Sequence, residues 1–308
     1  MAPKIFIDGE HGTTGLQIRT LLADRRNVEV ISVPADKRKD RDARAEFLNA
    51  ADIAILCLPD DAAKESVSLI ENDTTRVIDA STAHRVAEGW TYGFPELDAA
   101  QMDAVRAAKR VANPGCWPQG PIAMLRPLVT AGLLPADYPV TVNGISGYSG
   151  GGRPMMEDYV EKGSAAPGFL PYGLSLKHKH VPEIRAYAKL GHDPIMQPAV
   201  GNFAQGMITV VPLQLGHLSR VPTGAEMHEA IADHYAGLGG GVVEVAPLAE
   251  IERSDEINPE IYNGTNRMRL HVFANDQRAQ ALLVAVYDNL GKGASGAAVQ
   301  NMDLMLGL

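Results

Sequence analysis

The sequence predicts a two-domain α/β protein, in which a helix-covered parallel sheet precedes a mixed α/β (α+β) domain and a C-terminal helix returns to the first domain. Two observations predict this fold. Short apolar runs alternate with amphipathic segments in the first half of the chain, and this texture changes at about residue 117. The length of 308 residues suits two domains of roughly 100–200 residues each.

The first half contains the elements of a parallel sheet. The apolar runs expected to be strands are 5–7, 28–33, 53–58, 77–78 and 110–112. The segments expected to be covering helices are 16–22, 41–50 and 62–70. A strand, a helix and a further strand in this order are typical of parallel pairing with crossover helices.

The second half mixes the two patterns. Helical spacing is found at 122–134, strand-like runs at 140–145, 207–215 and 268–273, and two helical patterns in the tail at 281–290 and 296–306. We expect a first domain of residues 1–116, completed by 286–308, and a second domain of residues 117–285. No internal repeat is evident.

Composition excludes several classes of protein. A hydrophobic content of 45% with 21% charged residues is ordinary for a globular chain. The net charge of −9 argues against nucleic acid as a partner. Two cysteines are too few for a disulfide scaffold, and no apolar stretch approaches the ~20 residues of a membrane span. We expect a cytoplasmic protein with neither a nucleic-acid nor a membrane partner.

A glycine-rich turn follows the first apolar run in the order G-x-x-G-x-x-G and precedes an expected helix. Such glycines let backbone N–H groups approach a pyrophosphate at a helix N-terminus, as in Rossmann-type dinucleotide sites. A purely structural turn is the alternative. The residues expected to contact the cofactor here are Gly9, Gly12, Thr13, Thr14 and Gly15.

The end of the second apolar run indicates which dinucleotide is bound. An NAD enzyme places Asp or Glu here against the ribose 2′-hydroxyl, but Glu29 lies inside the run. Ser32 ends the run, and Lys37 and Arg38 follow in a basic stretch that suits a 2′-phosphate, although charge runs are usually solvated loops. We expect NADP(H), with Pro59 as a further cofactor contact.

Cys116 follows the turn Asn113-Pro-Gly and precedes a helical pattern, so it is expected at a helix N-terminus. Exposed amides and the helix dipole there stabilise a thiolate. Cys57 instead lies within an apolar strand and reads as a small buried hydrophobe. We therefore expect Cys116 to be a nucleophile.

Nine histidines are available as acid or base partners of a thiol. His178 and His180 alternate on an expected extended segment, so both side chains would share one face. A His-x-His pair also suggests a metal, but no third ligand with suitable spacing accompanies it, and we expect no metal. His217 is the reserve candidate.

Two further segments suit anions. Residues 146–153 could form a backbone nest in which Ser146, Ser149 and Gly150 surround an anion and Arg153 supplies a fork-shaped cation; a flexible hinge is the alternative. Ser81 and Arg85 follow the fourth expected strand, at the edge of the sheet where ligands gather, and we expect Ser81 to contact the cofactor.

Taken in order, these motifs resemble the short form of the N-acetyl-gamma-glutamyl-phosphate reductase family, within the semialdehyde dehydrogenase superfamily. The most specific matches are Asn-Pro-Gly-Cys at 113–116 and Lys-Gly-Ala-x-Gly-x-Ala-Val-Gln-Asn at 292–301. Ser-Thr-Ala-His-Arg at 81–85 is similar to the shorter members.

The resemblance implies an NADPH-dependent oxidoreductase of arginine biosynthesis that reduces N-acetyl-L-glutamyl 5-phosphate to the 5-semialdehyde and inorganic phosphate through a cysteine thioester. It implies that Cys116 is the nucleophile, that His180 is the acid/base, and that the chain forms a homodimer or homotetramer. Tail residues expected beside the nicotinamide are Gly296, Gln300 and Asn301. Residues expected to bind substrate are Arg85, Asn113, Ser146, Ser149, Gly150, Arg153 and His178.

Three alternatives stay open at this point. An aspartate-semialdehyde dehydrogenase has a similar nucleotide domain and cysteine mechanism, and substrate kinetics would separate the two. A reductase of a carrier-linked aminoadipyl phosphate would share much of the pattern and would show a basic docking surface. An NADP-binding regulator would bind the dinucleotide without being sensitive to thiol alkylation.

Overall fold

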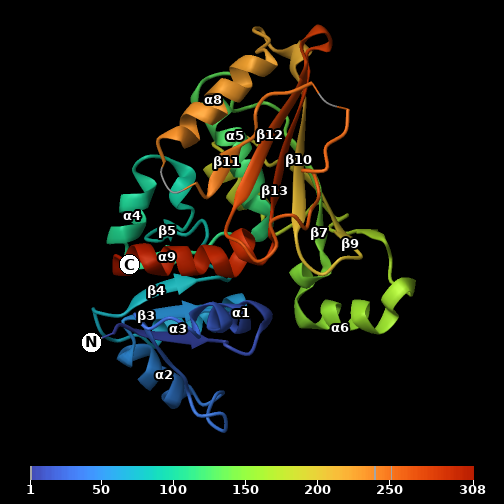
Figure 1. Ribbon diagram of the computed structural model, residues 1–308. Coiled ribbons are helices and arrows are strands. Elements are labelled where there is room, and N and C mark those ends of the chain that lie inside the picture. Colours follow the sequence, from blue (N-terminus) through green and yellow to red (C-terminus); the bar gives the residue numbers. More distant parts are fainter. Residues whose placement is uncertain (1, 239–240, 251) are drawn as a thin grey trace. The chain divides into compact units, whose positions relative to one another are not determined.

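The computed structural model describes residues 2–238, 241–250 and 252–308, which form two compact units (Figure 1). The first unit comprises the chain up to Pro95, then Ala100–Gly115 and Ala294–Leu308. The second comprises Glu96–Ala99 and Cys116–Gly293. None of the helices in the described residues is both long and apolar enough to cross a bilayer.

The first unit is built on a six-stranded parallel sheet with the strand order β2-β1-β3-β4-β6-β5. Its strands are β1 (Lys4–Asp8), β2 (Glu29–Ile31), β3 (Ile53–Leu56), β4 (Arg76–Asp79), β5 (Thr91–Tyr92) and β6 (Arg110–Ala112). The five apolar runs predicted as strands are confirmed. The edge strand β5 was not predicted because two residues are too short to show a period.

Helices cover both faces of this sheet. They are α1 (Thr13–Leu22), α2 (Arg41–Ala50), α3 (Asp60–Ser68), α4 (Gln101–Ala107) and α9 (Gly296–Leu306). Ile5 packs with Ile18 of α1 and Met302 of α9, whereas Phe6 belongs to a second core with Leu48 of α2. Neighbouring residues of a strand point to opposite faces, so β1 contributes to both cores. The predicted return of the C-terminal helix to the first domain is confirmed.

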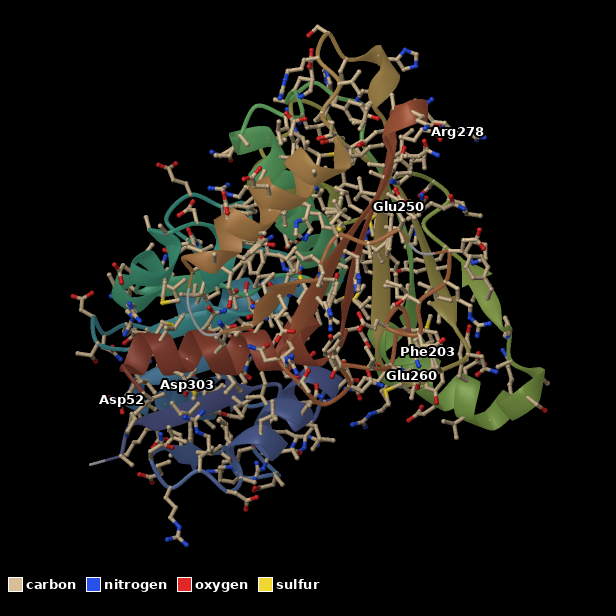
Figure 2. The ribbon with its side chains drawn as sticks, turned by 45° about the horizontal axis from the view of Figure 1, so that its top comes forward. Asp52, Phe203, Glu250, Glu260, Arg278 and Asp303 are labelled. Carbon is tan, nitrogen blue, oxygen red and sulfur yellow. The ribbon has the colours of Figure 1, made fainter. Side chains whose placement is uncertain are left out.

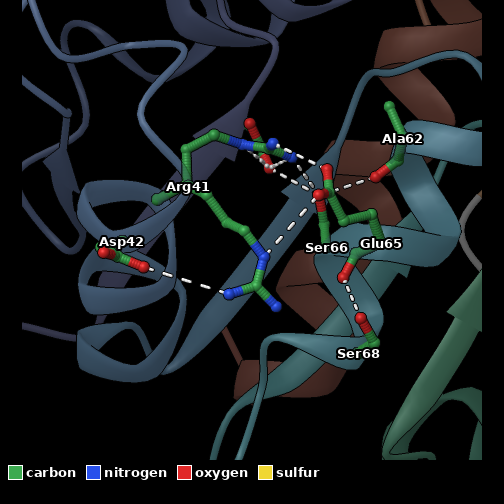
Figure 3. Close-up of polar contacts among 8 residues, drawn as sticks. Arg41, Asp42, Ala62, Glu65, Ser66 and Ser68 are labelled. Atoms are coloured by element: carbon green, nitrogen blue, oxygen red, sulfur yellow. Dashed lines mark hydrogen bonds and ion pairs between the residues drawn. The ribbon is translucent and has the colours of Figure 1, made fainter.

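A polar cluster joins α2 and α3 to the end of β1. Asp8, the last residue of β1, is 5% exposed and accepts hydrogen bonds from Arg44 Nη2 at 3.0 Å and from Ser66 Oγ at 2.8 Å. Figure 3 shows Ser66 and the neighbouring Arg41–Glu65 pair, whose Nε and Oε1 lie 3.9 Å apart. The cluster therefore anchors the end of the strand from which the glycine-rich turn departs.

The second unit is built on a seven-stranded mixed sheet with the order β11-β12-β13-β10-β7-β9-β8. Its strands are β7 (Thr141–Gly147), β8 (Phe169–Pro171), β9 (Ile195–Gly201), β10 (Met207–Gln214), β11 (Val243–Val245), β12 (Met268–Asn275) and β13 (Gln280–Tyr287). Its helices are α5 (Cys116–Thr130), α6 (Gly152–Lys162), α7 (Val181–Tyr187) and α8 (Gly224–Ala236). Helices α5 and α8 pack against the sheet, as expected for a mixed α/β domain.

The helix expected at 281–290 is wrong. This segment forms β13, which pairs antiparallel with β10 on one side and β12 on the other. A fully buried strand is a continuous apolar run, and periodicity alone does not distinguish such a run from a buried helix. The strand also keeps residues 286–293 in the second unit, where we had expected the first domain to resume, and Cys116 likewise belongs to the second unit.

The residues that follow β13 gather two distant loops of the second unit. Asp288 Oδ2 accepts hydrogen bonds from Gln205 Nε2 at 2.5 Å and from the backbone N–H of Gly264 at 2.8 Å. In Figure 2, Phe203 and Glu260 mark these loops, which lie side by side. Asp288 is fully buried, so the two loops share one internal anchor.

Candidate active site

Cys116 is the first residue of α5, the position that the Asn-Pro-Gly turn predicts. Its carbonyl oxygen accepts a hydrogen bond of 2.7 Å from Tyr287 Oη. Burial raises the pKa of Tyr287, so the phenol keeps its proton and remains a donor. The last residue of β13 thus holds the backbone of Cys116 in place.

Cys116 lies in a pocket of about 140 Å³ in the second unit. The predicted residues that line this pocket are Cys116, Ser146, Gly150, His178 and His180. The lining residues that were not predicted are Trp117, Gly147, Gly151, Met155, Tyr172, Lys179 and Val200. The fold therefore brings the thiol, both histidines and part of the glycine-rich loop together from segments far apart in the sequence.

The two histidines meet through a turn, not through the extended segment that we expected. The backbone N–H of His180 donates to Nδ1 of His178 at 3.3 Å, and the N–H of Val181 donates to the carbonyl of His178 at 3.1 Å. Their ring centroids are 4.8 Å apart. No three His, Cys, Asp or Glu side chains of the described residues are grouped so that they could hold a metal ion.

The two histidines differ in their surroundings. Burial, with a smaller effect of Lys179, lowers the pKa of His178 to about 4. His178 is therefore neutral near pH 7 and cannot act there as a charged acid. His180 is 6% exposed and precedes α7 as its N-cap residue.

Ser149 is held by a residue that no sequence motif indicates. Asn289 Nδ2 donates to Ser149 Oγ at 3.0 Å, while Asn289 Oδ1 accepts from the backbone N–H of Gly206 at 2.7 Å. Ser149 and Asn289 are both buried. The sequence around Asn289 has the spacing of a helix end, and no local pattern there indicates a contact with the glycine-rich loop.

Two other predicted residues lie away from this pocket. Arg153 is exposed in the first turn of α6 and is not among the lining residues. His217 lines a separate hollow of about 1120 Å³, together with Tyr138 and Arg220. The reserve candidate is therefore wrong as a partner of Cys116, because its segment follows β10 to a different part of the sheet.

The glycine-rich turn of the first unit has no room for side chains at two positions. Gly9 has φ +90°, and a Cβ there would lie 2.4 Å from the carbonyl oxygen of Cys57. A Cβ on Gly15 would lie 2.3 Å from the Gly9 oxygen. Helix α1 begins at Thr13, earlier than expected, with Gly12 as an N-cap that has no side chain to bond the first amides. This cradle fits a pyrophosphate.

The residues expected near the adenosine lie at different depths. Ser32 directly follows β2 and is partly buried, whereas Lys37 and Arg38 are exposed on the next turn. Glu29 is the first residue of β2, so it lies at the end of the strand opposite to that where ligands gather. Pro59 follows β3 as the N-cap of α3.

The segment after β4 holds the turn that precedes Cys116 in the chain. Asp79 is fully buried and accepts a hydrogen bond of 2.7 Å from Ser81 Oγ. Arg85 is 7% exposed, and its guanidinium donates to the carbonyl oxygens of Asn113 at 3.1 Å and Ala80 at 3.0 Å. These contacts give Arg85 a structural role in addition to its expected role in substrate binding.

Helix α9 brings the last predicted residues into the first unit. Asn301 is fully buried, and its amide donates to the carbonyl of Gly93 at 2.9 Å. The same amide donates to Asn113 Oδ1 at 3.1 Å. Gly296 begins the helix and Gln300 is partly buried on it.

Comparison with known proteins assigns both halves of the chain. Residues 4–105 match the semialdehyde dehydrogenase NAD binding domain, and residues 116–289 match the semialdehyde dehydrogenase dimerisation domain. The chain is 80% identical over 308 residues to the N-acetyl-gamma-glutamyl-phosphate reductase of Mesorhizobium japonicum, with 100% of both chains covered. It is 76% identical to the protein of that name from Chelativorans sp., with 99% of both covered, and 56% identical to that of Brucella anthropi, with 100% and 99% covered.

Solved structures with little sequence identity share the fold. Aspartate semialdehyde dehydrogenase II of Vibrio cholerae, complexed with ASA, superposes with a TM-score of 0.74 at 15% identity, covering 99% of this chain and 98% of that chain. The Candida albicans enzyme with NADP gives a TM-score of 0.67 at 13% identity, covering 99% of each. The chain therefore belongs to the semialdehyde dehydrogenase family and, within it, to the N-acetyl-gamma-glutamyl-phosphate reductases.

Proposed function

We propose that the protein reduces N-acetyl-L-glutamyl 5-phosphate to N-acetyl-L-glutamate 5-semialdehyde and phosphate in arginine biosynthesis, with NADPH as reductant. The observation that carries this proposal is the pocket in which Cys116, at the start of α5, lies with His178 and His180. The names of the close relatives support the acetylglutamyl group as the substrate.

The first step is nucleophilic attack by Cys116. The N-terminus of α5 favours the negative charge of a thiolate, which lowers the barrier to attack on the acyl carbon. The sulfur forms a bond to that carbon, and inorganic phosphate leaves with the electron pair of the broken C–O bond, so that a thioester remains. Backbone N–H groups at the start of α5 would stabilise the oxyanion that forms during attack.

The second step returns the thiolate and releases the aldehyde. NADPH supplies the hydride that reduces the thioester when it is bound. His180 is proposed to exchange the proton of the resulting thiohemiacetal as the C–S bond breaks. His178 is neutral and accepts a hydrogen bond from the backbone N–H of His180. We therefore propose that His178 orients His180 and that His180 exchanges the proton.

The glycine-rich cradle for the cofactor lies in the first unit, and the pocket of Cys116 lies in the second unit. The dinucleotide would lie on the glycine-rich cradle at Gly9 and Gly15, with its charge near the start of α1. Ser146 and Gly150, which line the pocket of Cys116, would bind the substrate together with Ser149, which lies between them in the sequence. We further propose that the protein works in the cytoplasm as a homodimer or homotetramer. Light scattering of the purified chain tests the oligomeric state.

The deciding experiment follows the reaction in reverse with the purified full chain. NADP⁺ reduction is measured with N-acetylglutamate semialdehyde and phosphate, and compared with aspartate semialdehyde and with a carrier-linked aminoadipate semialdehyde. We expect phosphate-dependent turnover on the acetylated substrate, reduced at least about 10³-fold in Cys116→Ser. Preference for another aldehyde, or near wild-type turnover in Cys116→Ser, would contradict the proposal.

A further inference from the structure

Three polar side chains form a cluster in the first unit that the sequence motifs did not indicate. Ser32 Oγ donates to Glu10 Oε2 at 2.9 Å, and Arg19 Nη1 donates to Ser32 Oγ at 3.0 Å. Arg19 also forms an ion pair with the Glu10 carboxylate. The Glu10 side chain is 13% exposed, whereas that of Arg19 is 49% exposed, so the carboxylate is enclosed while the guanidinium still reaches solvent.

The cluster lies where this fold places the adenosine ribose of a dinucleotide. Glu10 belongs to the glycine-rich turn, Arg19 to the last turn of α1, and Ser32 directly follows β2. In Rossmann-type sites the residues at the end of the second strand contact the ribose 2′ position. An acidic residue there accepts a 2′-hydroxyl, and an arginine nearby accommodates a 2′-phosphate.

The cluster contains both chemistries at once. A guanidinium presents a planar fork that matches phosphate oxygens, and a serine hydroxyl can donate to a third oxygen. A carboxylate has only acceptors and repels a phosphate, but it suits a ribose hydroxyl. Arg19 and Ser32 would attract the 2′-phosphate, and both are hydrogen-bonded to the Glu10 carboxylate, which would repel it.

We propose that Arg19, together with Ser32, binds the 2′-phosphate of NADP, and that Glu10 holds Arg19 in its binding position while limiting the preference for NADP over NAD. The inference rests on the proposed function for the identity of the cofactor. Arg19 is already ordered by two partners, so binding immobilises less of its side chain than it would for the exposed Lys37 or Arg38. Removing the charge of Glu10 would strengthen 2′-phosphate binding.

The test measures binding of two nucleotides that differ only in the 2′-phosphate. The full chain is titrated calorimetrically with adenosine 2′,5′-bisphosphate and with adenosine 5′-monophosphate. The difference between the two affinities measures the contribution of the 2′-phosphate without any catalytic step. The variants are Arg19→Ala, Arg19→Lys and Glu10→Gln. Arg26→Ala is the matched control, because Arg26 is exposed beyond the end of α1 and its loss changes the net charge equally.

We expect Arg19→Ala to weaken the bisphosphate at least about tenfold, and Arg19→Lys to weaken it less, because the fork is lost while the charge remains. Adenosine 5′-monophosphate should bind both variants within about twofold of the parent, a change of under about 0.5 kcal/mol, and Arg26→Ala should match the parent for both ligands. Glu10→Gln should tighten the bisphosphate several-fold.

Three results would overturn the inference. Equal weakening of both nucleotides in Arg19→Ala would make Arg19 a structural residue, and no weakening would remove it from the site. Weaker binding of adenosine 5′-monophosphate in Glu10→Gln, without a gain for the bisphosphate, would make Glu10 a ribose ligand that favours NAD. Because no aldehyde is present, failure of the proposed reaction leaves this measurement unaffected.

Discussion

Asn301 Nδ2 donates a hydrogen bond of 3.1 Å to Asn113 Oδ1, joining the C-terminal helix to the turn that ends at Cys116. Asn113 in turn donates from its own amide to the carbonyl of Ala294 at 3.0 Å, and its backbone N–H donates to Asp79 at 2.8 Å. The side chain of Asn113 is therefore held on both its donor and its acceptor atoms by residues 294–301.

Replacing Asn301 with alanine should destabilise the protein. Asn301→Ala removes the donor to Asn113 Oδ1 and to the carbonyl of Gly93, and both partners lie in the interior of the first unit. A buried polar group that loses its partner costs about 1–3 kcal/mol. Urea unfolding measures this change. Asn27→Ala, at an exposed asparagine, should change stability by less than about 0.5 kcal/mol. Equal effects of the two variants would contradict the role of Asn301.

Alkylation should distinguish the two cysteines. Burial, reinforced by Asp79 and Asp8, raises the pKa of Cys57 to about 12, so this side chain remains a thiol below that pH. Only the thiolate reacts readily. With iodoacetamide at pH 8 we expect Cys116 to be modified and Cys57 to be spared, as measured by peptide mass spectrometry. Denaturant should expose both. Labelling of native Cys57 at the rate of Cys116 would count against this assignment.

Stability should fall below neutral pH partly because of His178. Its folded pKa of about 4 lies below the usual 6.5, so between these values the unfolded chain binds the proton more strongly. Unfolding free energy therefore decreases as pH falls through this window. After allowance for solvent screening of a partly buried group, the contribution is roughly 1–2 kcal/mol. His178→Gln should show a shallower decrease between pH 7 and pH 4 in chemical unfolding. An unchanged slope would contradict the shift.

Lys292 and Glu96 form an enclosed ion pair whose two halves should be interdependent. Lys292 Nζ lies 2.7 Å from Glu96 Oε2, and the residues are 0% and 2% exposed. Burial lowers the pKa of Lys292, and Glu96 opposes that effect. Glu96→Gln leaves a buried ammonium and should cost about 3–5 kcal/mol.

The double variant Lys292→Met with Glu96→Gln should recover much of that loss, because no uncompensated charge remains. Thermal and urea unfolding of the two single variants and the double variant measure the coupling. Additive losses would show that the two side chains do not depend on each other in solution.

Asn289 should affect substrate binding more than turnover. It donates to Ser149 Oγ, and Ser149 is one of the residues that we propose to bind the substrate. Asn289→Asp keeps an acceptor for the Gly206 N–H but draws the Ser149 proton toward the carboxylate. We expect KM for the semialdehyde to rise about tenfold with kcat changed less than about threefold.

Asn289→Ala separates this effect from folding. It should raise KM similarly and also lower stability by about 1–3 kcal/mol, because the N–H of Gly206 loses its acceptor. If both variants lowered kcat and left KM unchanged, Asn289 would act on the chemistry of the pocket and not on the binding loop.

Much of the fold follows from local patterns. The alternation of apolar runs and amphipathic segments predicted the first sheet, because strands buried on both faces and their crossover helices differ in length and period. The Asn-Pro-Gly turn predicted the position of Cys116 at the start of α5. Errors arose where one pattern is compatible with two structures. The apolar run of β13 suits a buried helix as well as a buried strand, and only its pairing with β10 and β12 identifies it as a strand.

By itself, then, the sequence determined the type and order of most elements, and it placed a cysteine at a helix start and glycines where the backbone admits no side chain. The tertiary structure decided which groups meet. Asn289 contacts Ser149, Asn301 contacts Asn113, and Glu10 contacts Ser32. The residues of each pair are so far apart in the sequence that no periodic pattern connects them. Such pairs form only when distant strands and helices pack, because a hydrogen bond depends on a separation of a few ångströms in space and not on the distance along the chain.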